Sequence, residues 1–155
     1  MNKRIMIRVM AVAMLAMTMA ASAAGVSHQY PTPELLSGDT TIIDIRTPGE
    51  WSETGVVEGA IPITFFDERG GYDAAEFLRQ IEPLVSRDEP FAVICRTGNR
   101  TRAVSDFLAD QGYQVINLQG GIHYLMGSGY EPVEFAQRRE ELEQEGQCGL
   151  QAMSC

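Results

Sequence analysis

The feature that most limits the possible folds is an alternation of short apolar runs with helical patterns. The runs are apolar throughout, which is typical of strands buried on both faces of a parallel sheet. Amphipathic helical patterns separate them, so helices should cover both faces. The sequence therefore predicts an α/β fold with a mostly parallel sheet of about five strands. The expected strands are 41–45, 59–63, 91–94 and 115–118, and the expected helices are 33–37, a short piece from residue 50, 73–85, 101–110 and a short one around 123–126.

A cysteine stands at the end of one of these strands. The run 91–94 leads into Cys95, five polar or small residues follow, and a helical pattern then begins. Ligands of parallel sheets bind beyond the carboxyl ends of the strands, so Cys95 should lie at a binding site. The backbone N–H groups of such a loop and the following helix N-terminus favour anions. They should stabilise the thiolate and attract an anionic substrate, which makes Cys95 the candidate nucleophile.

The first 24 residues have the pattern of a secretory signal peptide. A start with three positive charges precedes an uncharged, mostly apolar stretch over 9–21, and small residues follow. This pattern predicts cleavage after Ala23 or Ala24. The alternative is an uncleaved membrane anchor, but the apolar stretch is shorter than the roughly 18 to 20 residues that a span requires. We therefore expect a periplasmic or secreted protein without membrane attachment after cleavage.

Cleavage would leave an acidic chain of 131 residues, which is one domain of ordinary size. Losing three positive charges takes the net charge from −9 to −12, and the only lysine is lost with them. Nucleic acid and anionic membrane surfaces are poor partners for such a surface. Three of the nine remaining arginines, Arg96, Arg100 and Arg102, fall within or just after the cysteine loop. This local reversal of charge indicates an anion site.

Four short motifs resemble those of the rhodanese (thiosulfate sulfurtransferase) family, in the same order. Residues 95–100, Cys-Arg-Thr-Gly-Asn-Arg, resemble its active-site loop. Residues 44–51 resemble its first signature, an Asp-x-Arg pair followed by Glu and an aromatic residue. Residues 57–61 and 120–133 resemble its second and closing signatures. The chain departs from the family pattern outside the cysteine loop, with Val56 for His, Glu58 for Pro and Leu125 for Trp.

The resemblance implies a rhodanese-like domain over 34–135 and a sulfurtransferase activity. Cys95 would take the outer sulfur of thiosulfate or a similar donor as a persulfide and pass it to cyanide or a thiol. From their position after a strand, Asp44 and Arg46 are expected to form an ion pair that fixes the turn, and the alternative is direct contact with the substrate. No cofactor is implied, and no residue cluster has metal-ligand spacing. The loop residues expected to bind the donor are Arg96, Thr97, Gly98, Asn99, Arg100 and Thr101.

Other functions of a cysteine fit less well. A cysteine hydrolase needs a histidine beside the thiol, but His28 is expected in an unanchored N-terminal segment and His123 at an ordinary helix position. Phosphatases and arsenate reductases of related fold place five residues between cysteine and arginine, whereas four separate Cys95 from Arg100. The alternative that stays open is a non-catalytic module that carries sulfane sulfur for a partner protein.

The last segment, 136–155, is predicted to be a polar tail. Its first part should form a charged, frayed helix with few residues to anchor it. Two cysteines follow, Cys148 and Cys155, and in an oxidising compartment they should form a disulfide. Alternatively, this pair accepts sulfur from a Cys95 persulfide or forms a disulfide with Cys95. The physiological donor and acceptor and the oligomeric state are not readable from the sequence.

Overall fold

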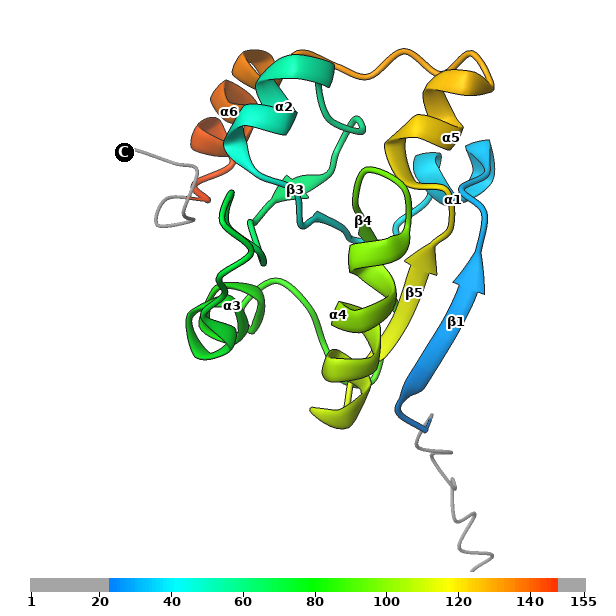
Figure 1. Cartoon of the computed structure of the whole chain (residues 1–155), viewed down its shortest axis with the longest axis vertical. Coiled ribbons are helices and arrows are strands. Elements are labelled where there is room, and N and C mark those ends of the chain that lie inside the picture. The colour runs from blue at the N-terminus through cyan, green and yellow to red at the C-terminus, as the bar shows by residue number, and fades with distance from the viewer. Residues whose placement is uncertain (1–22, 148–155) are drawn as a thin grey trace, which may run out of the picture.

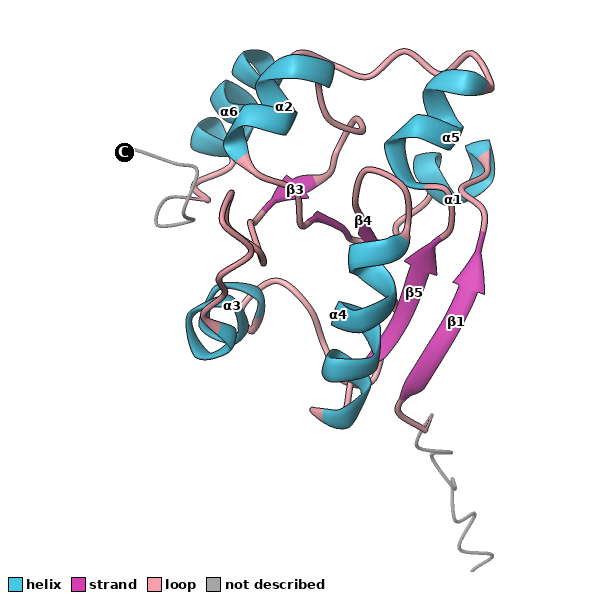
Figure 2. Ribbon diagram, viewed as in Figure 1, coloured by secondary structure: helices cyan, strands magenta, loops and turns pink. Residues whose placement is uncertain are grey.

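A computed structural model describes residues 23–147, which fold around one five-stranded sheet (Figure 1, Figure 2). All four strand pairings are parallel, and the spatial order is β1-β5-β4-β2-β3. The predicted parallel sheet is confirmed, and β4, which ends at the cysteine loop, is its central strand. The strands are β1 (Gly25–Gln29), β2 (Ile42–Asp44), β3 (Ile61–Pro62), β4 (Phe91–Ile94) and β5 (Gln114–Leu118).

Helices cover both faces of the sheet, as expected. Successive side chains of the buried strands point to opposite faces, so each face carries its own apolar core. On one face α3 (Ala74–Ile81) and α4 (Asn99–Asp110) pack against the strands, and on the other α1 (Pro33–Ser37) and α5 (Gly121–Gly127) do so. The first core includes Ile43, Phe77, Val93 and Leu108, and the second includes Leu36, Ile42, Ile94 and Leu125.

Two elements are at least three residues shorter than the sequence predicted. The helix expected over 73–85 ends at Ile81. Glu82 still has helical backbone angles, but Pro83 after it has no N–H to continue the helical hydrogen bonds. Asp73 lies outside this helix as its N-cap, where its carboxylate accepts a hydrogen bond from the Glu76 N–H. The strand expected over 59–63 is reduced to the two residues of β3 at the edge of the sheet.

Strand β1 corrects the expectation that the segment before α1 is unanchored. Gly25–Gln29 pairs residue by residue with β5, from Gly25 opposite Gln114 to Gln29 opposite Leu118. His28 is therefore part of the sheet, and its Nδ1 lies 3.0 Å from the Asn117 side-chain nitrogen. The sequence pattern missed this strand because an edge strand is only partly buried, and its last three residues are exposed.

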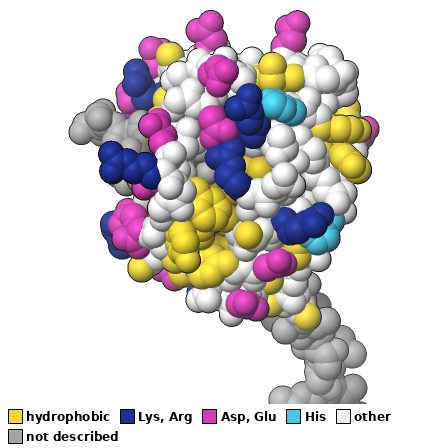
Figure 3. All heavy atoms as spheres, viewed as in Figure 1, with side chains coloured by type: hydrophobic (Ala, Val, Ile, Leu, Met, Phe, Trp, Pro, Cys, Tyr) yellow, Lys and Arg dark blue, Asp and Glu magenta, His cyan; other side chains and the backbone are white. Residues whose placement is uncertain are grey.

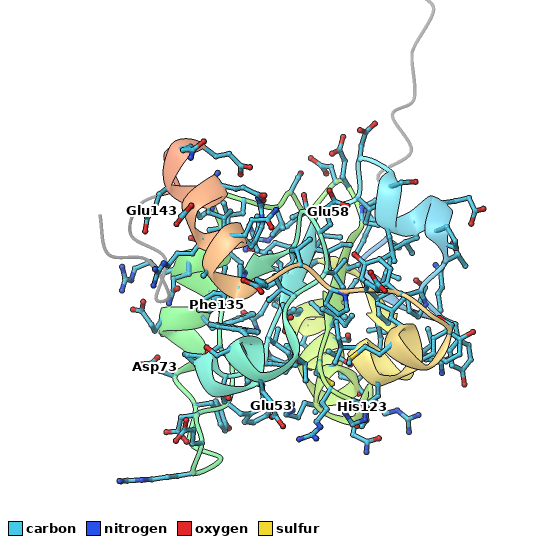
Figure 4. The ribbon with its side chains drawn as sticks, turned by 90° about the horizontal axis from the view of Figure 1, so that it is seen from above. Glu53, Glu58, Asp73, His123, Phe135 and Glu143 are labelled. Atoms are coloured by element: carbon cyan, nitrogen blue, oxygen red, sulfur yellow. The ribbon has the colours of Figure 1, made fainter. Side chains whose placement is uncertain are left out.

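Helices α2 (Pro48–Thr54) and α6 (Phe135–Gln144) lie side by side at the β3 end of the sheet (Figure 1). The buried indole of Trp51 in α2 packs against the Phe135 ring, with 5.2 Å between ring centroids. Figure 4 shows α6 from above, with Phe135 near its start and Glu143 near its end. This helix pair extends the apolar interior beyond the sheet.

The expectation of a frayed, weakly anchored helix near the C-terminus is wrong. Leu142 has no exposed surface, and the Arg138 side chain is almost fully buried. The Arg138 guanidinium donates to the carbonyl oxygens of Ala60 (2.9 Å) and Gly59 (3.2 Å), so it ties α6 to the loop before β3. The charged run concealed these contacts, because an arginine that binds two carbonyls looks like a surface arginine in the sequence.

Between residues 23 and 147, no helix is both long and apolar enough to cross a membrane. Most of the predicted signal peptide falls in 1–22, and the tail cysteines Cys148 and Cys155 fall in 148–155. Both segments lie outside the described residues.

Candidate active site

Cys95 follows β4 directly and lies at the carboxyl edge of the sheet, just before α4. Its side chain has no exposed surface. The Gly98 N–H donates a hydrogen bond to Sγ, with 3.1 Å between nitrogen and sulfur. Sγ therefore lies at the N-terminus of a twelve-residue helix, whose unpaired N–H groups and dipole favour negative charge. This position suits a thiolate and also an anionic persulfide.

Thr101 closes the loop from the first turn of α4. Its hydroxyl donates to the Gly98 carbonyl at 3.0 Å, and its oxygen lies 3.6 Å from the Cys95 sulfur. Either atom of the Thr101–Cys95 contact can be the donor, so the hydroxyl can donate to a Cys95 thiolate when it turns from the Gly98 carbonyl. Thr101 therefore fixes the loop backbone and also contacts the sulfur atom. It is fully buried, whereas Thr97 and Asn99 at the top of the loop are exposed.

Helix α5 supports the cysteine loop through its backbone. The N–H groups of Ile122 and His123 donate to the carbonyl oxygens of Cys95 (2.9 Å) and Arg96 (3.1 Å). This approach requires a glycine at position 121, where φ is +56° and a β-carbon would lie 2.2 Å from the Cys95 oxygen. The closing motif of the sequence thus has a physical purpose, which is to let a helix start directly against the loop.

Asp44 and Arg46 form the predicted ion pair, and both are buried. The Arg46 Nη2 and Nε donate to the Asp44 carboxylate at 2.7 and 3.0 Å. Arg46 also donates to the Thr54 hydroxyl (2.6 Å) and the Gly55 carbonyl (2.7 Å) at the end of α2. A cation is favourable at that end of a helix. The pair therefore fastens α2 to β2 and does not itself reach Cys95.

Arg100 is held by Glu50, a partner that the sequence analysis did not assign. The two guanidinium nitrogens of Arg100 donate to both carboxylate oxygens of Glu50 at 2.8 and 2.6 Å. The Thr47 N–H also donates to Glu50 at 3.1 Å, as part of a capping box that begins α2. The pattern Thr-x-x-Glu before a helix was the available signal for the capping role, but nothing in it identifies Arg100.

These contacts set the charge of the Glu50 carboxyl. Burial raises its pKa, but the hydrogen bonds from Arg100 and the Thr47 N–H, with the charges of Arg100 and Arg46, outweigh burial and lower the pKa to about 2. The bonds to Glu50 also raise the pKa of Arg100. The carboxylate and the guanidinium are thus charged throughout the neutral range. The expected binding of the donor by Arg100 stays a prediction, and it would have to occur with Glu50 in place.

Arg96 lies on the other side of the loop and contacts α5. Its Nε donates to the His123 Nε2 at 3.0 Å, so His123 is more than the ordinary helix residue that the sequence suggested. On the face drawn in Figure 3, dark blue, cyan and magenta side chains gather above a yellow apolar patch. In Figure 4 His123 lies at the same edge of the molecule as Glu53 of α2.

The structure thus brings together all the loop residues predicted from Cys95 to Thr101. It adds Glu50, Gly121 and His123, which act on the loop from α2 and α5. Within residues 23–147, no group of three or more His, Cys, Asp or Glu side chains is placed to hold a metal ion. The Gly98 N–H and the N-terminus of α4 both lie at the cysteine sulfur, an arrangement that favours negative charge on it.

Comparison with known proteins decides the family. The family described as "Rhodanese-like domain" matches residues 33–126, more than half of the chain. The chain belongs to the rhodanese-like family. The matched segment contains the cysteine loop and strands β2 to β5, whereas β1 lies before it.

Relatives of this rhodanese-like chain come from plants and bacteria. It is 32% identical over 104 residues to "Protein HIGH ARSENIC CONTENT 1, mitochondrial" of Arabidopsis thaliana. This match covers 65% of this chain but only 61% of the plant protein. It is 32% identical over 89 residues to "Sulfurtransferase" of Allochromatium vinosum, covering 54% of this chain and 69% of that protein. A solved structure of a rhodanese-related protein from Thermoplasma volcanium is 30% identical, covers 59% of this chain and 80% of that one, and has a TM-score of 0.45.

Proposed function

We propose that the protein transfers sulfane sulfur from a small anionic donor such as thiosulfate to cyanide or a thiol, through a persulfide on Cys95. The thiolate attacks the outer sulfur of thiosulfate, and a new S–S bond forms as the old one breaks. Sulfite leaves with the electron pair of the broken bond. Cyanide or a thiolate then attacks the terminal sulfur and forms a bond to it. The S–S bond to Cys95 breaks, and its electron pair returns to Cys95 as the thiolate. The cycle balances without an oxidant or reductant.

The observation that carries this proposal is the hydrogen bond from the Gly98 N–H to Cys95 Sγ at the N-terminus of α4. It supports a thiolate without any general base, which matters because thiolate attack on sulfur needs none. A donor at the same position gains the positive end of the helix and the arginines beside the loop. Membership in the rhodanese-like family and a relative named "Sulfurtransferase" support the same chemistry.

The burial of Sγ adds a requirement to this mechanism. Because Cys95 has no exposed surface, a donor reaches the sulfur only after the loop side chains that cover it move aside. The exposed residues of the loop are Arg96, Thr97 and Asn99. A small anion requires a smaller displacement than a large donor does, which favours thiosulfate or a polysulfide over a bulky persulfide.

Mass spectrometry of the intact protein tests the proposal. Thiosulfate should add the mass of one sulfur atom, and cyanide should remove it and yield thiocyanate. Cys95→Ser should lose both the adduct and the turnover, because no other group holds sulfur at the α4 N-terminus. A matched variant, Cys148→Ser with Cys155→Ser, should keep both. An adduct and turnover that persist in Cys95→Ser would refute the assignment.

The burial of Sγ also favours a second candidate, a carrier module. In this case Cys95 receives and releases sulfur only when a partner protein opens the loop, and the protein alone does not turn over. Cyanide-dependent turnover by the isolated protein separates the two functions. Measurable turnover with thiosulfate supports the enzyme, whereas a stable adduct without turnover supports the carrier.

We further propose that the chain is exported after cleavage at Ala23 or Ala24. Strand β1 begins at Gly25, so cleavage at either position would leave every strand of the sheet in the mature protein. In an oxidising compartment we expect a Cys148–Cys155 disulfide with Cys95 left free. Peptide mapping without reduction tests this pairing, and a bond from Cys95 to either tail cysteine would instead indicate redox coupling. The mass of the exported chain tests the cleavage position.

A further inference from the structure

We propose that His123 is a positioning residue for Arg96, and that it holds this arginine for the anionic donor only while its own ring is neutral. The inference rests on the proposed function, because it concerns how the donor is bound. It assigns a task to a residue of α5 whose side chain lies outside the cysteine loop.

The contact itself fixes the protonation state of the ring. The Arg96 Nε donates to His123 Nε2 at 3.0 Å, and an arginine has no acceptor atom. Nε2 must therefore carry a lone pair, which places the ring proton on Nδ1. A histidinium has no lone pair on either nitrogen and cannot accept this bond. The observed geometry is thus specific to neutral His123 in one of its two tautomers.

His123 contacts Arg96 at two points, and this makes it a positioning device. Besides the side-chain bond, its backbone N–H donates to the Arg96 carbonyl at 3.1 Å. The neighbouring Ile122 N–H donates to the Cys95 carbonyl at 2.9 Å, so this turn of α5 has a fixed place relative to Cys95. The exposed Arg96 side chain would otherwise sample many rotamers, and ordering it in advance lowers the entropy that donor binding must overcome.

His123 is exposed, and the described contacts of its ring include no carboxylate. Helix α5 carries no acidic or other basic residue, and Tyr124, next along it, packs its ring on Tyr30 with 4.7 Å between centroids. The loop presents Arg96, while Arg100 faces Glu50. Among these described neighbours, a histidinium would meet a guanidinium and no carboxylate. Protonation therefore breaks the bond and releases Arg96, while the solvent around these exposed side chains screens most of the repulsion between the two cations.

Histidine is the residue type whose charge changes between about pH 5 and 8. If Arg96 binds the donor in the held position, its release should raise the apparent Michaelis constant for thiosulfate as the pH falls. The turnover number at saturating donor should not depend on His123, because Cys95 performs the chemistry. The opposite result is a Michaelis constant that decreases as the pH is lowered. It would mean that the histidinium attracts the donor by charge alone.

Nuclear magnetic resonance tests the contact without any reaction. The chain has two histidines, His28 and His123, so a His28→Gln variant assigns the signals. We expect His123 to carry its proton on Nδ1 in the full chain and to change its tautomer populations in Arg96→Ala. A proton on Nε2 in the unchanged protein, or a spectrum that Arg96→Ala leaves unaltered, overturns the inference.

Kinetics across pH tests the task. Glutamine offers an oxygen acceptor but does not titrate. The ratio of the Michaelis constants of His123→Gln and Arg96→Ala should therefore stay nearly constant from about pH 7.5 to 5.5. The unchanged protein should lose roughly 2- to 10-fold in apparent affinity over this range relative to His123→Gln, the effect of one weak hydrogen bond. His123→Ala should resemble the low-pH state at every pH. Identical dependence of the Michaelis constant on pH in the unchanged protein and in His123→Gln would refute the claim that His123 positions Arg96.

The Cys95 sulfur adduct keeps this inference separate from the proposed function. If thiosulfate gives no adduct in the unchanged protein, the sulfur-transfer proposal fails. The tautomer of the His123 ring, measured by nuclear magnetic resonance, still tests the hydrogen bond between Arg96 and His123. If the adduct forms and only the pH profiles disagree, sulfur transfer stands and the positioning task is refuted.

Discussion

At the scale of single residues, Arg100 shows how one side chain serves both stability and the active site. Glu50 accepts two hydrogen bonds from it and is only 18% exposed. Arg100→Ala would leave this carboxylate half-enclosed without its partner, so we expect the free energy of unfolding to fall by about 1–3 kcal/mol. Urea denaturation measures the change. Arg102→Ala, an exposed arginine on the same helix, should have little effect, and equal stabilities of the two variants would contradict the prediction.

The pH dependence of stability follows from the same carboxylate. The pKa of Glu50 falls from its ordinary 4.5 to about 2, against the effect of burial, because Arg100 and the Thr47 N–H bind the ionised form. A lowered pKa stabilises the fold above the unfolded value, and this contribution is lost as the pH drops from about 4.5 towards about 2. Unfolding of the unchanged protein and Glu50→Gln should therefore differ most at neutral pH and converge in acid. A difference that grows on acidification would reverse the assigned sign.

At the scale of elements, the junction of α5 with the cysteine loop depends on one missing side chain. Gly121→Ala would place a β-carbon 2.2 Å from the Cys95 oxygen at a φ of +56°, so the loop or the helix must move. We expect this variant to lose most sulfur-transfer turnover and some stability. Gly127→Ala in the same helix is the control, since a β-carbon there meets nothing within 4 Å. Turnover that is equal in both variants would show that the loop tolerates the displacement.

The elements also show what a sequence can and cannot reveal. The strand before Cys95 and the helix after it were predictable, because a continuous apolar run and an amphipathic repeat are local patterns. The edge strand β1 was not, since Gly-Val-Ser-His-Gln contains no such run. The active-site partners were missed for a different reason. Glu50 and Arg100 are 50 positions apart, and only the fold brings α2 and the loop together.

At the scale of the whole molecule, α6 anchors the C-terminal part of the described chain through Arg138 and Leu142. A chain that ends after Glu145 keeps Arg138 and Leu142 in place, so it should retain nearly all turnover and thermal stability. A chain that ends after Glu134 loses both residues and uncovers the Trp51 indole, so it should unfold at lower temperature. Thermal denaturation followed by circular dichroism compares the two. Reduced turnover in the longer truncated chain, with its fold intact, would place the tail cysteines on the path of the sulfur.

The place of β1 in the sheet affects when the sheet can be completed during synthesis. This strand leaves the ribosome first among the strands, but β5, its neighbour in the sheet, is made last, and Gly25 pairs with a residue 89 positions later. Contacts between distant segments form slowly, because a long loop must close before they do. The central strands β2 and β4 can pair before β5 has been made, whereas β1 has no partner until then. A nascent chain therefore cannot complete its sheet until synthesis has passed Leu118.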